Sequence, residues 1–143
     1  MRYSQYGEIY RRLNEAIASN NTSAMAAVID TETFLAMLPG IEVPLDFAQF
    51  VVELDRQRMM FSDFGRNVTI KEMIVDDNRL GAFYTMTVTH DGPLMTRDGR
   101  EILPATNKKI TVKSMDSLTF NNAGKIVHVV VVSDRMNTLS QLI

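Results

Sequence analysis

The clearest hydrophobic pattern lies between residues 110 and 134, where the sequence predicts two long strands joined by a tight turn. The turn is Asn-Asn-Ala-Gly at residues 121–124, and asparagine and glycine tolerate the left-handed backbone that such turns require. The first strand alternates, and its apolar face carries Ile110, Val112, Leu118 and Phe120. The second is apolar on both faces from Ile126 to Val132, so we expect helices or another subunit to cover it on both sides.

Ser114 and Asp116 interrupt the apolar face of the first strand. A carboxylate on the core side of a strand is costly unless it is paired, hydrogen-bonded or protonated. Two interpretations of Asp116 follow. It is either an acid in an apolar pocket, with a raised pKa and a role in proton transfer, or a buried acid paired with Arg58 or a hydroxyl group. The first predicts an upward pKa shift and a salt bridge to Arg58 predicts a downward one.

The chain before residue 68 has the pattern of helices. Residues 3–19 predict an amphipathic helix whose apolar face includes Tyr10, and a second helix follows, capped by Thr22 or Ser23. A short extended piece is expected at residues 31–38. A third helix should begin near residues 44–46, where Asp46 suits the positive end of the helix dipole. Arg58 lies on its apolar stripe, so it either reaches out to solvent or meets a buried acid.

From residue 68 onward the pattern is that of strands. Strands are expected at residues 68–75 and 80–90, followed by turns at 91–93 and 96–99 that flank a short ribbon. The two long strands above come next, and a helical turn at 135–142 ends the pattern. This order of elements, with the helices before an antiparallel meander of strands, predicts an α+β fold. Its N-terminal helices would pack on a strongly bent antiparallel sheet. We expect one domain over residues 1–143.

Composition narrows the functional classes. The net charge is −2 without a basic stripe, so nucleic-acid binding is not expected. No apolar run reaches the ~20 residues of a membrane span, and the first residues do not resemble a signal peptide, so the cytoplasm is the expected location. The chain has no cysteine and only two isolated histidines, His90 and His128, so no metal site is expected.

The remaining candidates are acids, tyrosines and a histidine, and each has a structural alternative. Asp134 would act as a general base at a pocket mouth or cap the last helix. Tyr10 and Tyr84 would line a pocket or simply pack in the core. His90 would contact ligand or belong to the turn that follows it, and Arg58 would anchor a ligand carboxylate or orient Asp116.

Four stretches in this order resemble SnoaL-like polyketide cyclases of the nuclear transport factor 2-like superfamily. They are Phe61-Ser62-Asp63-Phe64, Thr89-His90-Asp91-Gly92, the hairpin at residues 120–126, and the terminal segment at residues 133–142. The resemblance covers nearly the whole chain. It implies a cone-shaped, barrel-like fold that encloses a pocket, and homodimers that pair through the sheet.

The resemblance also implies roles for two acids. Asp134 matches the acid or base of the cyclases and epoxide hydrolases, and Asp116 matches the oxyanion-site aspartate of the ketosteroid isomerases. The histidine that partners the cyclase acid falls on Thr119 or Phe120 and is therefore absent. Ser114 stands where the epoxide hydrolases have arginine.

Two hypotheses of different class follow. The first is a small-molecule enzyme of cyclase, hydrolase or isomerase type, without a cofactor, acting on an apolar oxygenated substrate. Asp116 and Asp134 would perform the acid/base chemistry, and Tyr10, Arg58, Tyr84 and His90 would line the site. The second is a noncatalytic ligand-binding or dimerisation module of the same fold, which the missing partner residues favour.

Overall fold

The computed structural model describes residues 3–143, in which four helices accompany seven strands. The helices are α1 (Tyr3–Ala18), α2 (Thr22–Val28), α3 (Phe47–Met60) and α4 (Arg135–Leu142). The strands are β1 (Leu35–Met37), β2 (Asn67–Asp76), β3 (Arg79–Thr89), β4 (Leu94–Met95), β5 (Glu101–Leu103), β6 (Lys109–Phe120) and β7 (Ile126–Ser133). None of the helices within residues 3–143 has the length and apolar character needed to cross a bilayer.

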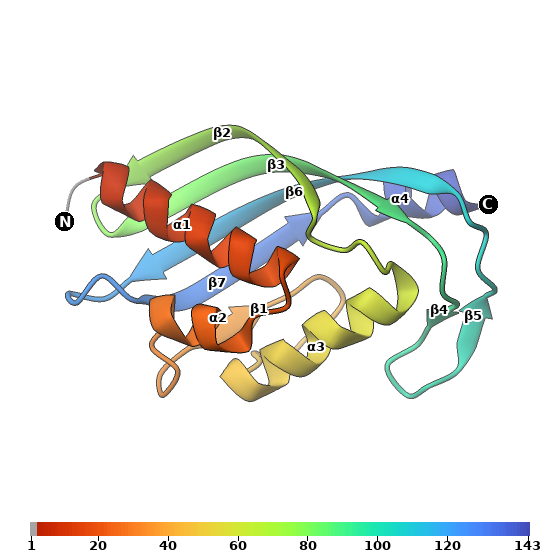
Figure 1. Ribbon diagram of the computed structural model, residues 1–143, viewed down its shortest axis with the longest axis horizontal. Helices are drawn as coiled ribbons and strands as arrows, with labels where there is room; N and C mark the ends of the chain where they lie inside the picture. Colours follow the sequence, from red (N-terminus) through yellow and green to blue (C-terminus); the bar gives the residue numbers. More distant parts are fainter. Residues whose placement is uncertain (1–2) are drawn as a thin grey trace.

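A curled five-stranded sheet forms the body of the protein, with strand order β1-β7-β6-β3-β2. Helices α1, α2 and α3 lie against one face of this sheet, and α4 lies beside the first residues of β6 (Figure 1). The predicted α+β fold with N-terminal helices on a bent sheet is confirmed. The sheet curls without closing into a barrel. It is also not wholly antiparallel, because β1 pairs with β7 in parallel, with Ala36 opposite Val129.

The helix starts follow local capping chemistry. At α3 the Asp46 carboxylate accepts from the Gln49 backbone N–H at 2.9 Å, and the Gln49 side chain accepts from the Asp46 backbone N–H at 2.9 Å. This reciprocal capping box satisfies two donors that would otherwise lack partners. The cap predicted for α2 was wrong by one residue, because Asn21 rather than Thr22 or Ser23 accepts from Ala24 N–H.

The β6–β7 hairpin forms where the sequence predicts it. Gly124 adopts a φ of +78° in the turn, a left-handed value that glycine reaches without steric cost. The inward face of β6 holds the expected apolar residues, and Ser114 and Asp116 lie on that same face. Asp116 sits between Ala82 of β3 and Val131 of β7, near the centre of the sheet.

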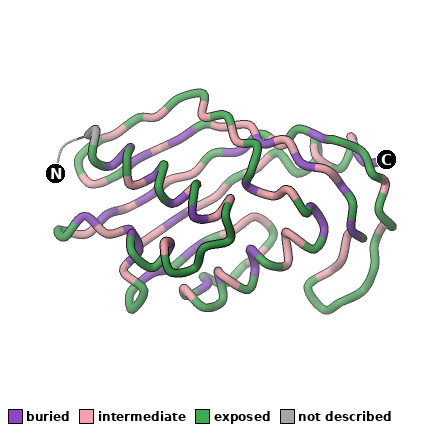
Figure 2. The backbone as a smooth tube through the Cα atoms, viewed as in Figure 1, coloured by how far each residue is buried: buried purple, intermediate pink, exposed green. Residues whose placement is uncertain are grey.

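Buried residues recur along the central strands of the sheet and along α1, α2 and α3 (Figure 2). One apolar cluster surrounds α1, α2 and the hairpin end of the sheet, and it includes Tyr10, Phe34 and Phe120. A second, smaller cluster lies at the other end of the sheet and joins Met60 and Phe61 to Val88 and neighbouring strand residues. The layer between sheet and helices is therefore apolar along its length, and it is where a cavity can open.

Candidate functional site

A cavity of about 470 Å³ lies between the sheet and the helices, and its wall is mostly apolar. The volume falls within the range of known small-molecule sites. Residues from both apolar clusters line it. Its charged lining residues are Glu53, Arg56, Asp116 and Arg135. Among residues 3–143 no group of three or more His, Asp or Glu side chains is arranged to hold a metal ion.

Asp116 projects into this cavity from β6 and is held by two tyrosines. Tyr10 of α1 donates its hydroxyl hydrogen bond to Oδ2 of Asp116 at 2.8 Å. Tyr84 of β3 donates to Oδ1 at 3.3 Å, a longer and weaker bond. Tyr84 lines the cavity beside Asp116, whereas Tyr10 is fully buried and is not part of the cavity wall. Tyr10 therefore holds the carboxyl group from the core side, and Tyr84 holds it from the cavity side.

Burial dominates the electrostatics of this group. It raises the pKa of Asp116 to about 6, while the hydrogen bonds from Tyr10 and Tyr84 act in the opposite direction. Burial also raises the pKa of both tyrosines well above the usual value, and the neighbouring Asp116 charge raises it further. Both phenols therefore stay protonated at neutral pH. Asp116 can exist in either protonation state near neutrality, as a proton-transfer group requires.

Asn14 is a site residue that the sequence analysis did not single out. It lies one helical turn after Tyr10 on α1 and lines the cavity. Its amide nitrogen Nδ2 is buried and makes no hydrogen bond of regular geometry among the described residues, although it lies near enough to the Tyr10 hydroxyl to favour a lower pKa of that phenol. A buried donor without a partner is costly, so a ligand oxygen at this place would satisfy it. The spacing of four from Tyr10 was the available signal, because residues four apart share a helix face.

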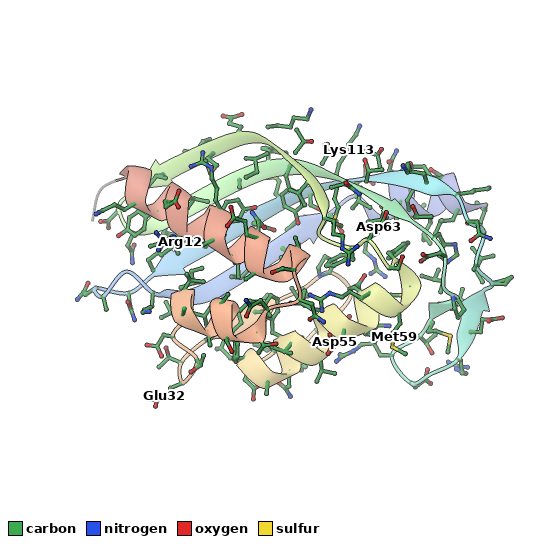
Figure 3. The ribbon with its side chains drawn as sticks, in the orientation of Figure 1. Arg12, Glu32, Asp55, Met59, Asp63 and Lys113 are labelled. Carbon is green, nitrogen blue, oxygen red and sulfur yellow. The ribbon has the colours of Figure 1, made fainter. Side chains whose placement is uncertain are left out.

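Arg58 does not meet Asp116. Its guanidinium donates to Asp55 Oδ1 at 2.9 Å and to the backbone carbonyl of Ile17 at 2.9 Å. Asp55 is labelled on α3 in Figure 3. Arg58 therefore ties α3 to the end of α1, and it is not among the cavity-lining residues. The partners of Asp116 are the two tyrosines, in keeping with the raised rather than the lowered pKa.

His90 lies just beyond the end of β3 and is completely buried, rather than at the surface of a turn. Its Nδ1 lies 3.2 Å from the Thr106 backbone nitrogen and 2.9 Å from the Thr106 hydroxyl oxygen, and its buried Nε2 has no hydrogen-bond partner among the described residues. The ring packs near Phe61, with centroids 5.7 Å apart. Burial lowers the pKa of His90, against the effect of the neighbouring Asp91 charge. His90 is not among the cavity-lining residues, and its contacts join the end of β3 to the segment after β5.

Asp134 occupies the N-cap of α4. Its carboxylate accepts from the Asn137 backbone N–H at 3.0 Å, and the residue is exposed and absent from the cavity wall. This geometry matches the capping alternative for Asp134. The structure therefore does not bring the two predicted carboxylates into one site.

We predict that Asp134→Ala lowers the free energy of unfolding by about 0.5–2 kcal/mol, because the first turn of α4 loses its cap. Asp134→Asn should be nearly neutral, since asparagine caps equally well. Urea denaturation of both variants checks this. Equal destabilisation by Ala and Asn would show that the charge, and not the cap, matters at this position.

A curled sheet covered by helices, with an apolar cavity between them, is the arrangement that the resemblance to the class of nuclear transport factor 2-like folds implies. Within that class, the family model of the SnoaL-like polyketide cyclases matches residues 7–142, and the chain belongs to this family. The resemblance seen in the sequence is thereby confirmed. A search of curated proteins finds none that matches the chain.

Solved structures show the same fold at low sequence identity. AclR from Streptomyces galilaeus superposes with a TM-score of 0.79 at 17% identity, covering 99% of this chain and 97% of its own. IdmH from Streptomyces antibioticus superposes with a TM-score of 0.81 at 18% identity, and the match covers 96% of this chain and 98% of IdmH. A SnoaL-like polyketide cyclase from Agrobacterium tumefaciens superposes with a TM-score of 0.75 at 16% identity, and the match covers 96% of this chain and 97% of the cyclase.

Proposed function

We propose that this protein catalyses cofactor-free acid/base chemistry on an apolar carbonyl compound bound in the cavity. The observation that carries the proposal is the Asp116 carboxyl group in the wall of an apolar cavity, with Tyr10 and Tyr84 as its hydrogen-bond donors. Family membership supports the same class of reaction. Asp134, which caps α4, has no part in this scheme.

In the proposed reaction the ionised Asp116 accepts a proton from the carbon next to a substrate carbonyl. The electron pair of the broken C–H bond moves onto the carbonyl oxygen and forms an enolate. The amide of Asn14 donates a hydrogen bond to that oxygen, where negative charge develops. The Tyr84 hydroxyl, whose single hydrogen is donated to the ionised Asp116, turns to the same oxygen once Asp116 has taken up the proton. The enolate carbon then attacks a second carbonyl of the substrate, and the protonated Asp116 returns its proton to the new alkoxide.

The experiment that tests this function needs no knowledge of the natural substrate. Proton abstraction next to a carbonyl exchanges hydrogen for deuterium in D₂O. We expect the protein to accelerate exchange at the α-carbon of small aromatic ketones such as 1-tetralone and 2-acetylnaphthalene, followed by proton NMR. Binding of these ketones without exchange would instead support the noncatalytic ligand-binding alternative.

We also propose that the protein is a homodimer that pairs through the outer face of its sheet. Phe83, Met115 and Val132 lie side by side across β3, β6 and β7, and they are 49%, 42% and 59% exposed. A contiguous exposed apolar row on a sheet is typical of an interaction surface. Self-association through this row would cover the second face of β7, which the sequence pattern also requires.

Met115→Glu should therefore convert the dimer into a monomer, because it places a charge in the middle of the apolar row. Sedimentation velocity measures the change. Val52→Glu on α3 is the matched control, since Val52 is 66% exposed and lies away from the sheet. A monomeric wild type, or equal dissociation by both variants, would contradict the proposed interface.

A further inference from the structure

The charges in the cavity wall are not balanced. Glu53 is buried, and it is neutralised by Arg56, whose Nε lies 3.0 Å and 3.1 Å from the two carboxylate oxygens. Gln57 and Arg97 add further contacts to the same carboxylate, at 3.1 Å and 3.7 Å. Within the cavity wall, Glu53 and Arg56 form a hydrogen-bonded ion pair, and the Arg97 side chain, which is not part of the wall, makes the longer contact. Asp116 is engaged by its two tyrosines.

Arg135 is the remaining charged residue of the wall. It has no acidic partner among residues 3–143. It also opens α4, where a cation opposes the helix dipole and gains nothing locally. The preceding Asp134 does not neutralise it through an ion pair, since that carboxylate caps the backbone at Asn137. An arginine that breaks a local rule without compensation marks a place where function is the better explanation.

The position of this guanidinium is defined by the loop beneath it. Gly40 has a φ of +75°, and a Cβ built at Gly40 would lie only 2.5 Å from Arg135 Nη1. The guanidinium therefore rests directly on the backbone of the loop that follows β1, at a place that a side chain would occupy. Pro39 and Ile41 on either side of Gly40 also line the cavity. Arg135 thus lies at the rim of the cavity, against Gly40, and the residue is exposed.

A second donor of the cavity wall, the amide of Asn14 on α1, is buried. It lies beside Tyr10, which donates to Asp116. Val131 of β7 is opposite Asp116, and Ser133, which also lines the cavity, is two residues or ~7 Å further along the strand. Arg135 follows Ser133 at the start of α4. The start of α4 therefore lies more than two strand residues along the cavity wall from Asp116, a separation on the order of a fused ring pair.

We infer that the ligand of this cavity is an elongated apolar carboxylic acid, with its carboxylate on Arg135 at the rim and an oxygen acceptor near Asn14 and Asp116. The inference names the substrate class of the proposed function and rests on it for the chemistry at Asp116. Arginine suits a carboxylate because its planar fork can donate two parallel hydrogen bonds. Neutral carbonyl compounds of the same shape bind the same cavity more weakly.

A matched pair of probes tests this inference: 6-methoxy-2-naphthylacetic acid and its methyl ester, titrated by naphthalene fluorescence at low ionic strength. We expect the acid to bind about fivefold or more tightly than the ester, a modest factor because the rim is open to solvent. Arg135→Gln should reduce the acid-to-ester ratio to about one, and Arg135→Lys should keep part of it. Arg79→Gln removes an exposed arginine outside the cavity and controls for net charge.

The binding results test the role of Arg135, and the exchange results test the catalytic role of Asp116, so either proposal can fail without the other. Equal binding of acid and ester by the wild type, or a preference that survives Arg135→Gln in a folded protein, would overturn the role of Arg135. The exchange of neutral 1-tetralone would be untouched by that outcome. A carboxylate preference that depends on Arg135, with no exchange of any ketone, would support the inference and sink the catalytic role of Asp116.

Discussion

Replacing Asp116 by asparagine should lower the rate of α-deuterium exchange by about 10²–10⁴-fold, the usual contribution of a positioned general base. Asparagine has nearly the same shape and still accepts the hydrogen bond from Tyr10, so the cavity should keep its form. What it loses is the ability to take up a proton. Proton NMR of 1-tetralone in D₂O, with wild type and variant at equal concentration, measures the ratio.

Asp134→Asn is the informative comparison, because it makes the same chemical change at the other carboxylate predicted from the sequence. Asn is as good an N-cap as Asp, so the fold of α4 should persist. A loss confined to Asp116→Asn would assign the chemistry to the cavity. A comparable loss in Asp134→Asn would return Asp134 to the catalytic site, and unchanged exchange in both variants would rule out a carboxylate base.

The second large effect concerns stability and pH. The pKa of Asp116 is raised to about 6 in the folded protein from an ordinary value of 3.8, chiefly by burial. Between these two values the folded state binds more protons than the unfolded state, so the free energy of unfolding falls as pH rises. A shift of this size corresponds to about 3 kcal/mol at most. The stability that protonated Asp116 contributes is complete below pH 4 and is lost above pH 6.

Asp116→Asn removes this titration. The free energy of unfolding of the variant minus that of the wild type should therefore increase by up to about 3 kcal/mol between pH 4 and pH 8. Urea denaturation across this range measures the difference, and the other ionisable groups cancel because both proteins share them. A difference that stays flat with pH would mean that Asp116 is well solvated. A difference that decreases would mean that a cation stabilises the carboxylate.

Slower exchange and a pH-dependent gain in stability in Asp116→Asn would together show that this residue supports the reaction at a cost in stability. The ionised carboxylate that transfers protons is the form that the apolar surroundings destabilise. Tyr10 and Tyr84 offset part of that cost by donating hydrogen bonds to it. The same arrangement accounts for both the reactivity and the pH dependence.

Much of the fold could be predicted from local patterns. The start of α3 at Asp46 and the β6–β7 hairpin both depend on residues close in sequence, and both form as predicted. Strand alternation likewise predicts that Asp116 lies on the inner face of β6, and the residue does lie there. The parallel pairing of β1 with β7 could not be read in this way, because it joins segments about ninety residues apart.

The same distinction between local patterns and long-range packing applies to the candidate site. The sequence by itself determined the layered α+β architecture and the acid on the core-facing side of a strand, because periodicity and capping are short-range properties of the chain. The family came from the resemblance of four short stretches, which the family model bears out. Only the tertiary structure decided what surrounds that acid. Tyr10 reaches Asp116 across 106 positions, and Arg58 turns instead to Asp55 and the end of α1. Hydrogen bonds between distant residues depend on how whole elements pack, and no local pattern records that packing.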